Sequence, residues 1–183
     1  MTRIPLDPPR TLTGRFTEWY SLRRYGQVLE PGRAMQHNGR VLTTTLLAET
    51  SALRWRSLDP TLKALAQMVP AAAIGCSWCM DFGAFLSHHE GVAPEKIRQV
   101  PVWHDSDAYT DLERQVMAYA EAMTQTPPTV TDEMVEGLRA RLSDEQLVEL
   151  TALVALENQR SRTNAALGLT SQGFKASCDL EPV

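Results

Sequence analysis

The sequence predicts an all-α protein, and three observations lead to that expectation. Apolar residues recur at helical spacing over most of the chain, and no segment shows sustained alternation of apolar and polar residues between hairpin turns. Glycine or proline follows most of the predicted helices. Helix start signals are frequent, in the form of two capping boxes and one Asp-Pro pair: Thr110 with Glu113, Ser143 with Gln146, and Asp59 with Pro60.

The first third of the chain is expected to hold an extended arm and two helical regions. Three prolines within residues 1–12 favour an extended arm. A short amphipathic helix is predicted from Thr13 to about Tyr25, and Gly26 should end it. The apolar residues that suit such a helix are Phe16, Trp19, Tyr20 and Leu22. A longer helical region begins at Pro31, with these expected buried positions: Met35, Val41, Leu42, Thr45, Leu46 and Ala48.

The centre of the chain is expected to form two helices joined near Gly75. The first begins with Asp59 as its N-cap and places four apolar residues at helical spacing: Leu62, Leu65, Ala66 and Val69. Pro70 should kink or end it, because proline lacks the N–H that a helix interior requires. The second runs to about His89, and Gly91 closes it.

The remaining elements follow from caps and breaks. Pro94 begins a short helix, and residues 100–106 are expected to form a loop carrying Trp103 and His104. The helix that starts at the Thr110 capping box is stopped by the Pro-Pro pair at 127–128. The next helix starts at Thr131, and the longest helix spans residues 144–167. The expected organisation is therefore an arm (1–12), one helical domain (13–170) and a tail (171–183).

Composition narrows the classes of function. The chain of 183 residues has 43% apolar and 22% charged residues, which is typical of a globular protein. A net charge of −4 without a long basic run argues against a nucleic-acid partner. The longest apolar stretch, residues 64–85, is interrupted by Gln67, Pro70 and Asp81, so it predicts a core segment and no membrane partner. Three cysteines and no apolar signal region favour a reducing, cytoplasmic location.

The richest functional signal is the Cys-x-x-Cys motif at Cys76 and Cys79. Positions i and i+3 share one helix face, and a thiol at a helix N-terminus has a lowered pKa. Cys76 is therefore the expected nucleophile and Cys79 its resolving partner. The alternative without redox chemistry is a pair of buried cysteines that act as small apolar residues. A zinc site is disfavoured, because the sequence supplies two nearby ligands where structural zinc needs four.

Three neighbouring residues are candidates for the same site. Asp81 is a candidate acid or base, although it lies off the cysteine face, and it could instead serve the helix dipole. Trp78 could form a wall of a substrate pocket or be a core aromatic residue. Gly83 shares the face of the two cysteines and either leaves room for substrate or allows close helix packing.

Polar residues in the longest helix and the third cysteine are less informative. The polar positions are expected to brace the Cys-x-x-Cys helix or an oligomer interface: Glu157, Asn158, Arg162 and Asn164. Cys178 is expected to be a thiol in a mobile tail, with a third redox partner as the alternative. No glycine-rich phosphate loop or other cofactor motif is present in the sequence.

The order of motifs resembles the carboxymuconolactone decarboxylase-like, alkylhydroperoxidase-D-like family over roughly residues 35 to 170. The residues that carry the resemblance are Cys76 and Cys79, Glu113-Arg114 with Tyr119-Ala120, the run 144–150, and Asn158 with the run 162–168. The resemblance implies an all-helical bundle that assembles as a homo-oligomer. It also implies that two cysteines reduce hydroperoxides or exchange disulfides with a partner, helped by an upstream glutamate and a histidine four residues after the second cysteine.

This sequence departs from the family pattern at both relay positions. Gly83 occupies the place of the histidine, and Ala64 occupies the expected place of the glutamate. The leading hypothesis is a dithiol oxidoreductase that takes a hydroperoxide or other small molecule and is restored by a thiol reductant or redox partner protein. The alternatives are a non-enzymatic oligomeric binding or scaffold protein and a small-molecule lyase on the same scaffold.

Overall fold

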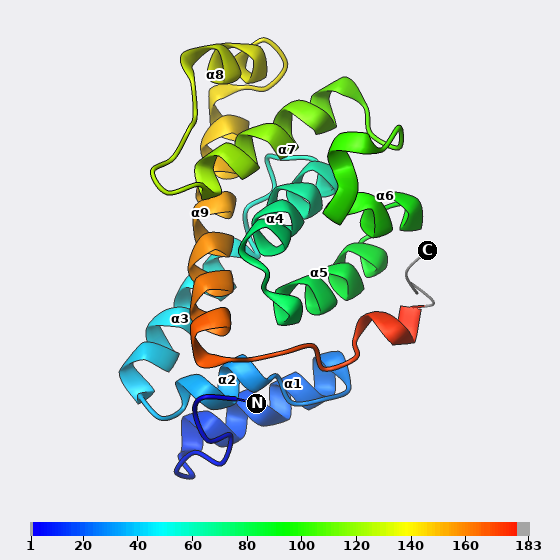
Figure 1. The fold of residues 1–183 in the computed structure, drawn as a ribbon. Helices are drawn as coiled ribbons and strands as arrows, with labels where there is room; N and C mark the ends of the chain where they lie inside the picture. Colours follow the sequence, from blue (N-terminus) through cyan, green and yellow to red (C-terminus); the bar gives the residue numbers. More distant parts are fainter. Residues whose placement is uncertain (1, 179–183) are drawn as a thin grey trace. The chain divides into compact units, whose positions relative to one another are not determined.

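The computed structural model describes residues 2–178 and is helical, with no strand among these residues (Figure 1). The all-α prediction is confirmed. The described residues divide into two compact units: one contains residues 2–55 and 166–169, and the other contains residues 56–165 and 170–178. No helix within the described range is long and apolar enough to cross a membrane.

The first unit contains α1 (Leu12–Tyr25), α2 (Glu30–Met35) and α3 (Gly39–Ala52). Gly26 ends α1 as predicted, with a φ of 77° that favours glycine. The longer helical region expected from Pro31 consists of two helices, because the chain leaves helical geometry between α2 and α3. Asn38 restarts it as an N-cap, with its side chain accepting hydrogen bonds from the N–H groups of residues 40 and 41.

The large apolar side chains of α1 are exposed. Phe16 and Trp19 are 62% and 59% exposed, and Tyr20 and Leu22 are also exposed. The buried positions of α1 are instead the small residues Gly14 and Ser21. A Cβ at Gly14 would clash with Gln36, and Ser21 is bonded to the backbone of residues 27 and 29, so small residues allow the close approach.

The predicted core positions after Pro31 are only partly correct. Leu42 is almost fully buried, whereas Val41 and Ala48 are exposed. The other three predicted positions are half-buried: Met35, Thr45 and Leu46. The helical period was therefore recognised, but a period alone does not reveal which face has a neighbour within the chain.

The second unit is built around α4 (Pro60–Ile74), which packs against α5 (Ser77–His89) and α7 (Asp111–Thr124). Asp59 caps α4 as predicted, accepting hydrogen bonds from the N–H groups of Thr61 and Leu62. Pro70 does not end this helix, which continues to Ile74. Pro70 is itself buried in a densely apolar segment, and that tertiary packing outweighs the lost backbone hydrogen bond.

The remaining elements are α6 (Pro94–Gln99), α8 (Asp132–Arg139), α9 (Asp144–Leu167) and two 3₁₀ helices. Residues 100–106 were expected to form a loop, but η1 (Val100–Asp105) occupies most of them and buries Trp103. Both predicted capping boxes are present, at the starts of α7 and α9. The tail contains η2 (Lys175–Cys178).

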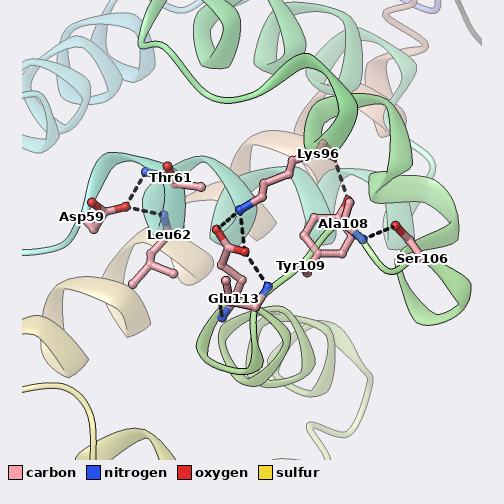
Figure 2. A network of polar contacts seen from close by, with 9 residues as sticks. Asp59, Thr61, Leu62, Lys96, Ser106, Ala108, Tyr109 and Glu113 are labelled. Carbon is pink, nitrogen blue, oxygen red and sulfur yellow. Dashed lines mark hydrogen bonds and ion pairs between the residues drawn. The ribbon is translucent and has the colours of Figure 1, made fainter.

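A partly buried ion pair links α6 to the start of α7 (Figure 2). The Lys96 ammonium contacts the two carboxylate oxygens of Glu113 at 2.6 and 2.7 Å. Glu113 also accepts a hydrogen bond from the N–H of Thr110, and the Tyr109 hydroxyl donates to the Lys96 carbonyl. The capping box is therefore joined to a tertiary contact, which fixes the direction in which α7 leaves the preceding segment.

Candidate functional site

The Cys-x-x-Cys motif lies at the N-terminus of α5, on the buried side of the second unit. Cys76 and Cys79 form a disulfide, with their Cα atoms 5.3 Å apart. Cys76 is the N-cap, and its sulfur accepts a hydrogen bond from the Cys79 N–H at 3.2 Å. The side chains are 1% and 7% exposed, respectively. The chain therefore brings both thiols together where the helix dipole favours negative charge.

Asn164 of α9 reaches the second cysteine. Its Nδ2 lies 3.3 Å from the Cys79 sulfur, across 85 residues of sequence. Asn164 is 2% exposed, and its Oδ1 is buried without a hydrogen-bond partner. The expectation that a polar residue of the longest helix contacts the Cys-x-x-Cys helix is met by this residue.

The other polar residues of α9 bind elsewhere. The Glu157 carboxylate accepts from Ser161 and contacts Arg160, which also donates to Gln67 on α4. Asn158 donates to the Thr124 hydroxyl, and Arg162 donates to the Thr124 carbonyl. These contacts fix α9 against α4 and against the end of α7.

Glu149 is a further buried carboxylate on α9. It accepts a hydrogen bond from the Ser57 N–H at 2.7 Å and lies 3.3 Å from the Lys63 ammonium. Burial raises the pKa of Glu149, but these two partners and the N–H of Leu58 outweigh it, so the pKa lies below its ordinary value. Glu149 is therefore held ionised as a contact between α9 and the start of α4.

Asp81 anchors the tail of the chain. Its carboxylate accepts hydrogen bonds from three backbone N–H groups, those of Gln172 (2.8 Å), Phe174 (3.0 Å) and Lys175 (2.8 Å). Burial raises the pKa of Asp81, but the N–H groups of Lys175 and Phe174, the Ser171 hydroxyl and the Gln172 N–H together lower it below its ordinary value. Asp81 is thus ionised and occupied by the tail.

Aromatic contacts hold the same tail segment. Trp78 donates from its indole N–H to Gln172 at 2.7 Å, and its ring lies 4.9 Å from that of Phe82. Phe174 packs against the rings of Phe82 and Phe85. Cys178 is buried within η2, which packs on α5. The expectation of a mobile-tail thiol is wrong for this part of the tail; residues 179–183 lie outside the described range.

A cavity of about 390 Å³ opens beside the motif. Its lining includes the two residues that flank Cys76 (Gly75 and Ser77), two residues of α5 (Met80 and Asp81), and two tail residues (Ser171 and Lys175). The tail therefore forms part of the wall of this cavity. Sequence reasoning missed Ser171 and Lys175, because nothing local links them to α5.

Small residues occupy the positions of the two missing relay groups. A Cβ at Gly83 would lie 3.6 Å from the Met68 side chain, which is an ordinary contact with α4. Ala64 is 3% exposed in the core. Among residues 2–178, no three His, Cys, Asp or Glu side chains gather in a way that could hold a metal ion.

Comparison with known proteins gives consistent results. The model of the carboxymuconolactone decarboxylase family matches residues 42–122. The uncharacterized protein YnjA of Escherichia coli K12 is 33% identical over 157 residues, which are 85% of this chain and 86% of YnjA. The uncharacterized protein YdfG of Bacillus subtilis is 25% identical over 113 residues, which are 61% of this chain and 77% of YdfG.

Solved structures share the fold. The alkylhydroperoxidase AhpD core protein from Ralstonia eutropha JMP134, described as peroxidase-related, has a TM-score of 0.83 at 17% identity, covering 95% of this chain and 94% of that one. The debrominase Bmp8 has a TM-score of 0.81 at 19% identity, covering 95% and 96%. With a buried Cys-x-x-Cys pair at disulfide distance on an all-helical scaffold of this kind, the chain belongs to the carboxymuconolactone decarboxylase family, as the resemblance noted from its motifs implied.

Proposed function

We propose that this protein is a dithiol oxidoreductase of the alkylhydroperoxidase type, in which Cys76 and Cys79 alternate between two thiols and a disulfide. The observation that carries the proposal is the position of the pair. Both sulfurs lie at the N-terminus of a 13-residue helix and within bonding distance of each other. A pair that served only as small apolar residues would not need this arrangement.

Cys76 is the better nucleophile of the two. It is the N-cap residue, so a negative charge on its sulfur is stabilised by the Cys79 N–H and by the helix dipole. In the reaction, the Cys76 thiolate attacks one oxygen of a hydroperoxide and breaks the O–O bond. The alkoxide leaves and takes a proton to become an alcohol, and Cys76 becomes a sulfenic acid.

The second step closes the disulfide. The Cys79 thiolate attacks the sulfur of the Cys76 sulfenic acid, and hydroxide leaves and takes a proton to become water. A reduced dithiol partner then restores both thiols by thiol–disulfide exchange and is itself oxidised to a disulfide. The sum is the conversion of one hydroperoxide and one dithiol into an alcohol, water and a disulfide.

Substrate is proposed to enter through the cavity beside Cys76. Its wall includes Ser77, which follows Cys76 in the chain, and the tail residues Ser171 and Lys175. Asp81 contributes by holding that tail rather than by accepting a proton, because three N–H groups already bind its carboxylate. Trp78 contributes in the same way through its contact with Gln172.

The direct test is the consumption of an organic hydroperoxide in the presence of a small dithiol reductant. Cys76→Ser and Cys79→Ser should each abolish turnover, whereas Cys178→Ser should retain it, because Cys178 lies outside the disulfide. Turnover that survives in both motif variants would reject the proposal. Wild-type protein that leaves the hydroperoxide intact would also reject it and would favour a binding or scaffold role.

A second candidate is a small-molecule lyase or dehalogenase on the same scaffold. It is favoured by the whole-chain fold match with the debrominase Bmp8 and by the cavity next to Cys76. Incubation of reduced protein with brominated aromatic compounds, read as bromide release, separates the two candidates. Bromide release without hydroperoxide turnover would favour the second.

A further inference from the structure

We propose that Asn164 is the hydrogen-bond donor that activates the sulfur of Cys79 by stabilising its thiolate form. The inference rests on the proposed redox function. It concerns a residue on α9, far from the motif in sequence, that contacts one of the two reacting atoms directly.

Asn164 contacts the Cys79 sulfur directly in a buried environment. Asn164 Nδ2 lies 3.3 Å from the Cys79 sulfur, and the two residues are 2% and 7% exposed. Little water competes for the sulfur at this depth, so an amide N–H has a larger effect there than at the surface. An N–H donor binds a thiolate more strongly than a thiol or a disulfide sulfur, because the acceptor then carries a full negative charge.

Packing alone does not explain an amide side chain at position 164. Asn164 Oδ1 is buried and has no hydrogen-bond partner. A buried polar atom without a partner is destabilising, so an apolar side chain of similar shape would serve a purely structural position better. The amide is explained if its other end, the N–H group, acts on Cys79.

The Asn164 amide is held in place by contacts of α9. One helical turn before Asn164, Arg160 donates to Gln67 on α4 and contacts Glu157, and Ser161 also donates to Glu157. These contacts fix α9 against α4, which itself packs against α5. The donor therefore does not have to be ordered when charge develops on the sulfur.

The consequence for the chemistry follows from the two redox steps. When an external thiolate attacks the Cys76 sulfur, the S–S bond breaks and its electron pair stays on Cys79, whose thiolate Asn164 stabilises. In the opposite direction, the same stabilisation raises the fraction of Cys79 present as thiolate, ready to attack the Cys76 sulfenic acid. Because the donor favours the reduced pair over the disulfide, it also makes the pair a stronger oxidant.

The experiment compares Asn164→Leu with Asn158→Leu in the full chain. Asn158 is the matched control, because it lies on the same helix and donates to Thr124 and a backbone carbonyl, not to a cysteine. The pKa of Cys79 is measured by pH-dependent alkylation of reduced protein and mass spectrometry of its peptide. The dithiol–disulfide equilibrium is measured in glutathione buffers, and the melting temperature is measured on both variants.

In Asn164→Leu, the pKa of Cys79 should rise by about one unit or more, since a hydrogen bond to a charged group is lost. The equilibrium should shift at least about tenfold toward the disulfide, which is about 30 mV. The melting temperature should be unchanged or higher. Asn158→Leu should lower the melting temperature and leave the Cys79 pKa and the equilibrium as in wild type.

Asn164→Asp provides a second variant of nearly the same shape. Its carboxylate offers no N–H and repels a thiolate, so the pKa of Cys79 should rise further than in the leucine variant. A Cys79 pKa and glutathione equilibrium that stay at wild-type values in both Asn164 variants would overturn the inference, as would a lower pKa in the leucine variant. These readouts need no peroxide, so they are independent of whether the wild-type protein turns over.

Discussion

Replacing Asp81 by asparagine should release the tail from α5. The carboxylate accepts the Lys175 N–H on one oxygen and the N–H groups of Gln172 and Phe174 on the other. An asparagine side chain has one oxygen and one NH₂ group, so its NH₂ must face at least one of these N–H donors. The substitution therefore removes the charge and also places donor against donor.

The size of the effect follows from these three hydrogen bonds. A hydrogen bond to a charged group contributes about 1.5–3 kcal/mol, and bonds that share one acceptor do not add fully. The asparagine retains one acceptor oxygen, so we expect the tail to lose about 3 kcal/mol of local stability. That loss corresponds to an opening equilibrium that is about a hundredfold larger.

Amide hydrogen exchange measures this opening directly. The N–H groups of Gln172, Phe174 and Lys175 should lose about two orders of magnitude of protection in Asp81→Asn. Asp107→Asn, at an exposed position of the second unit, is the matched control and should leave these amides unchanged. Unchanged protection of the three amides in Asp81→Asn would refute the assignment of Asp81 as the anchor.

The same contact gives a pH dependence of defined sign. The pKa of Asp81 is lowered in the folded state, so ionised Asp81 stabilises the folded tail at every pH above its ordinary value. That contribution declines as the pH falls below the ordinary value and through the lowered one. The protection difference between wild type and Asp81→Asn should therefore be constant at neutral pH and shrink in strong acid. A difference that disappears already near pH 6 would contradict this assignment.

Three further substitutions test other contacts, and each has its own readout. Glu149→Gln should lower the free energy of unfolding by about 2–3 kcal/mol at pH 7 in denaturant titrations, because Lys63 loses its partner. This loss should shrink below the ordinary glutamate pKa, since the pKa of Glu149 is lowered on folding. Lys96→Met should cost about 2 kcal/mol, because it leaves the buried Glu113 carboxylate without its cation; an unchanged denaturation midpoint would contradict this. We also propose that a second copy of the chain covers the exposed apolar face of α1. Trp19→Glu should then reduce the mass measured by analytical ultracentrifugation. A wild-type protein that sediments as a monomer would reject that proposal.

The helices could be read from the sequence because their end signals are local. Asp59 before Pro60 and the Thr110–Glu113 pair each satisfy free N–H groups within one turn, and the structure places helix starts at both. Pro70 does not end α4, because the effect of a proline on a helix depends on how well the surrounding apolar residues pack. Whether Trp19 is covered depends on neighbours that the sequence pattern does not specify.

The candidate site was predictable only in part, for the same reason. The Cys-x-x-Cys spacing identifies the two cysteines as candidates, and the structure joins them in a disulfide. The roles of Asp81 and Asn164 depend on contacts that span 91 to 94 and 85 residues of sequence. No local pattern around Lys175 or Ser171 indicates that they line the cavity beside Cys76. A tertiary structure was needed to see these residues together.

The most direct measurement is a peroxide titration of fully reduced protein, with each cysteine followed by differential alkylation and mass spectrometry. One equivalent of organic hydroperoxide should convert Cys76 and Cys79 into their mutual disulfide, and a dithiol should reverse it. Cys178 should stay a thiol under the same conditions. If Cys76 and Cys79 both remain thiols after exposure to excess hydroperoxide, the pair is not a peroxide-reducing dithiol.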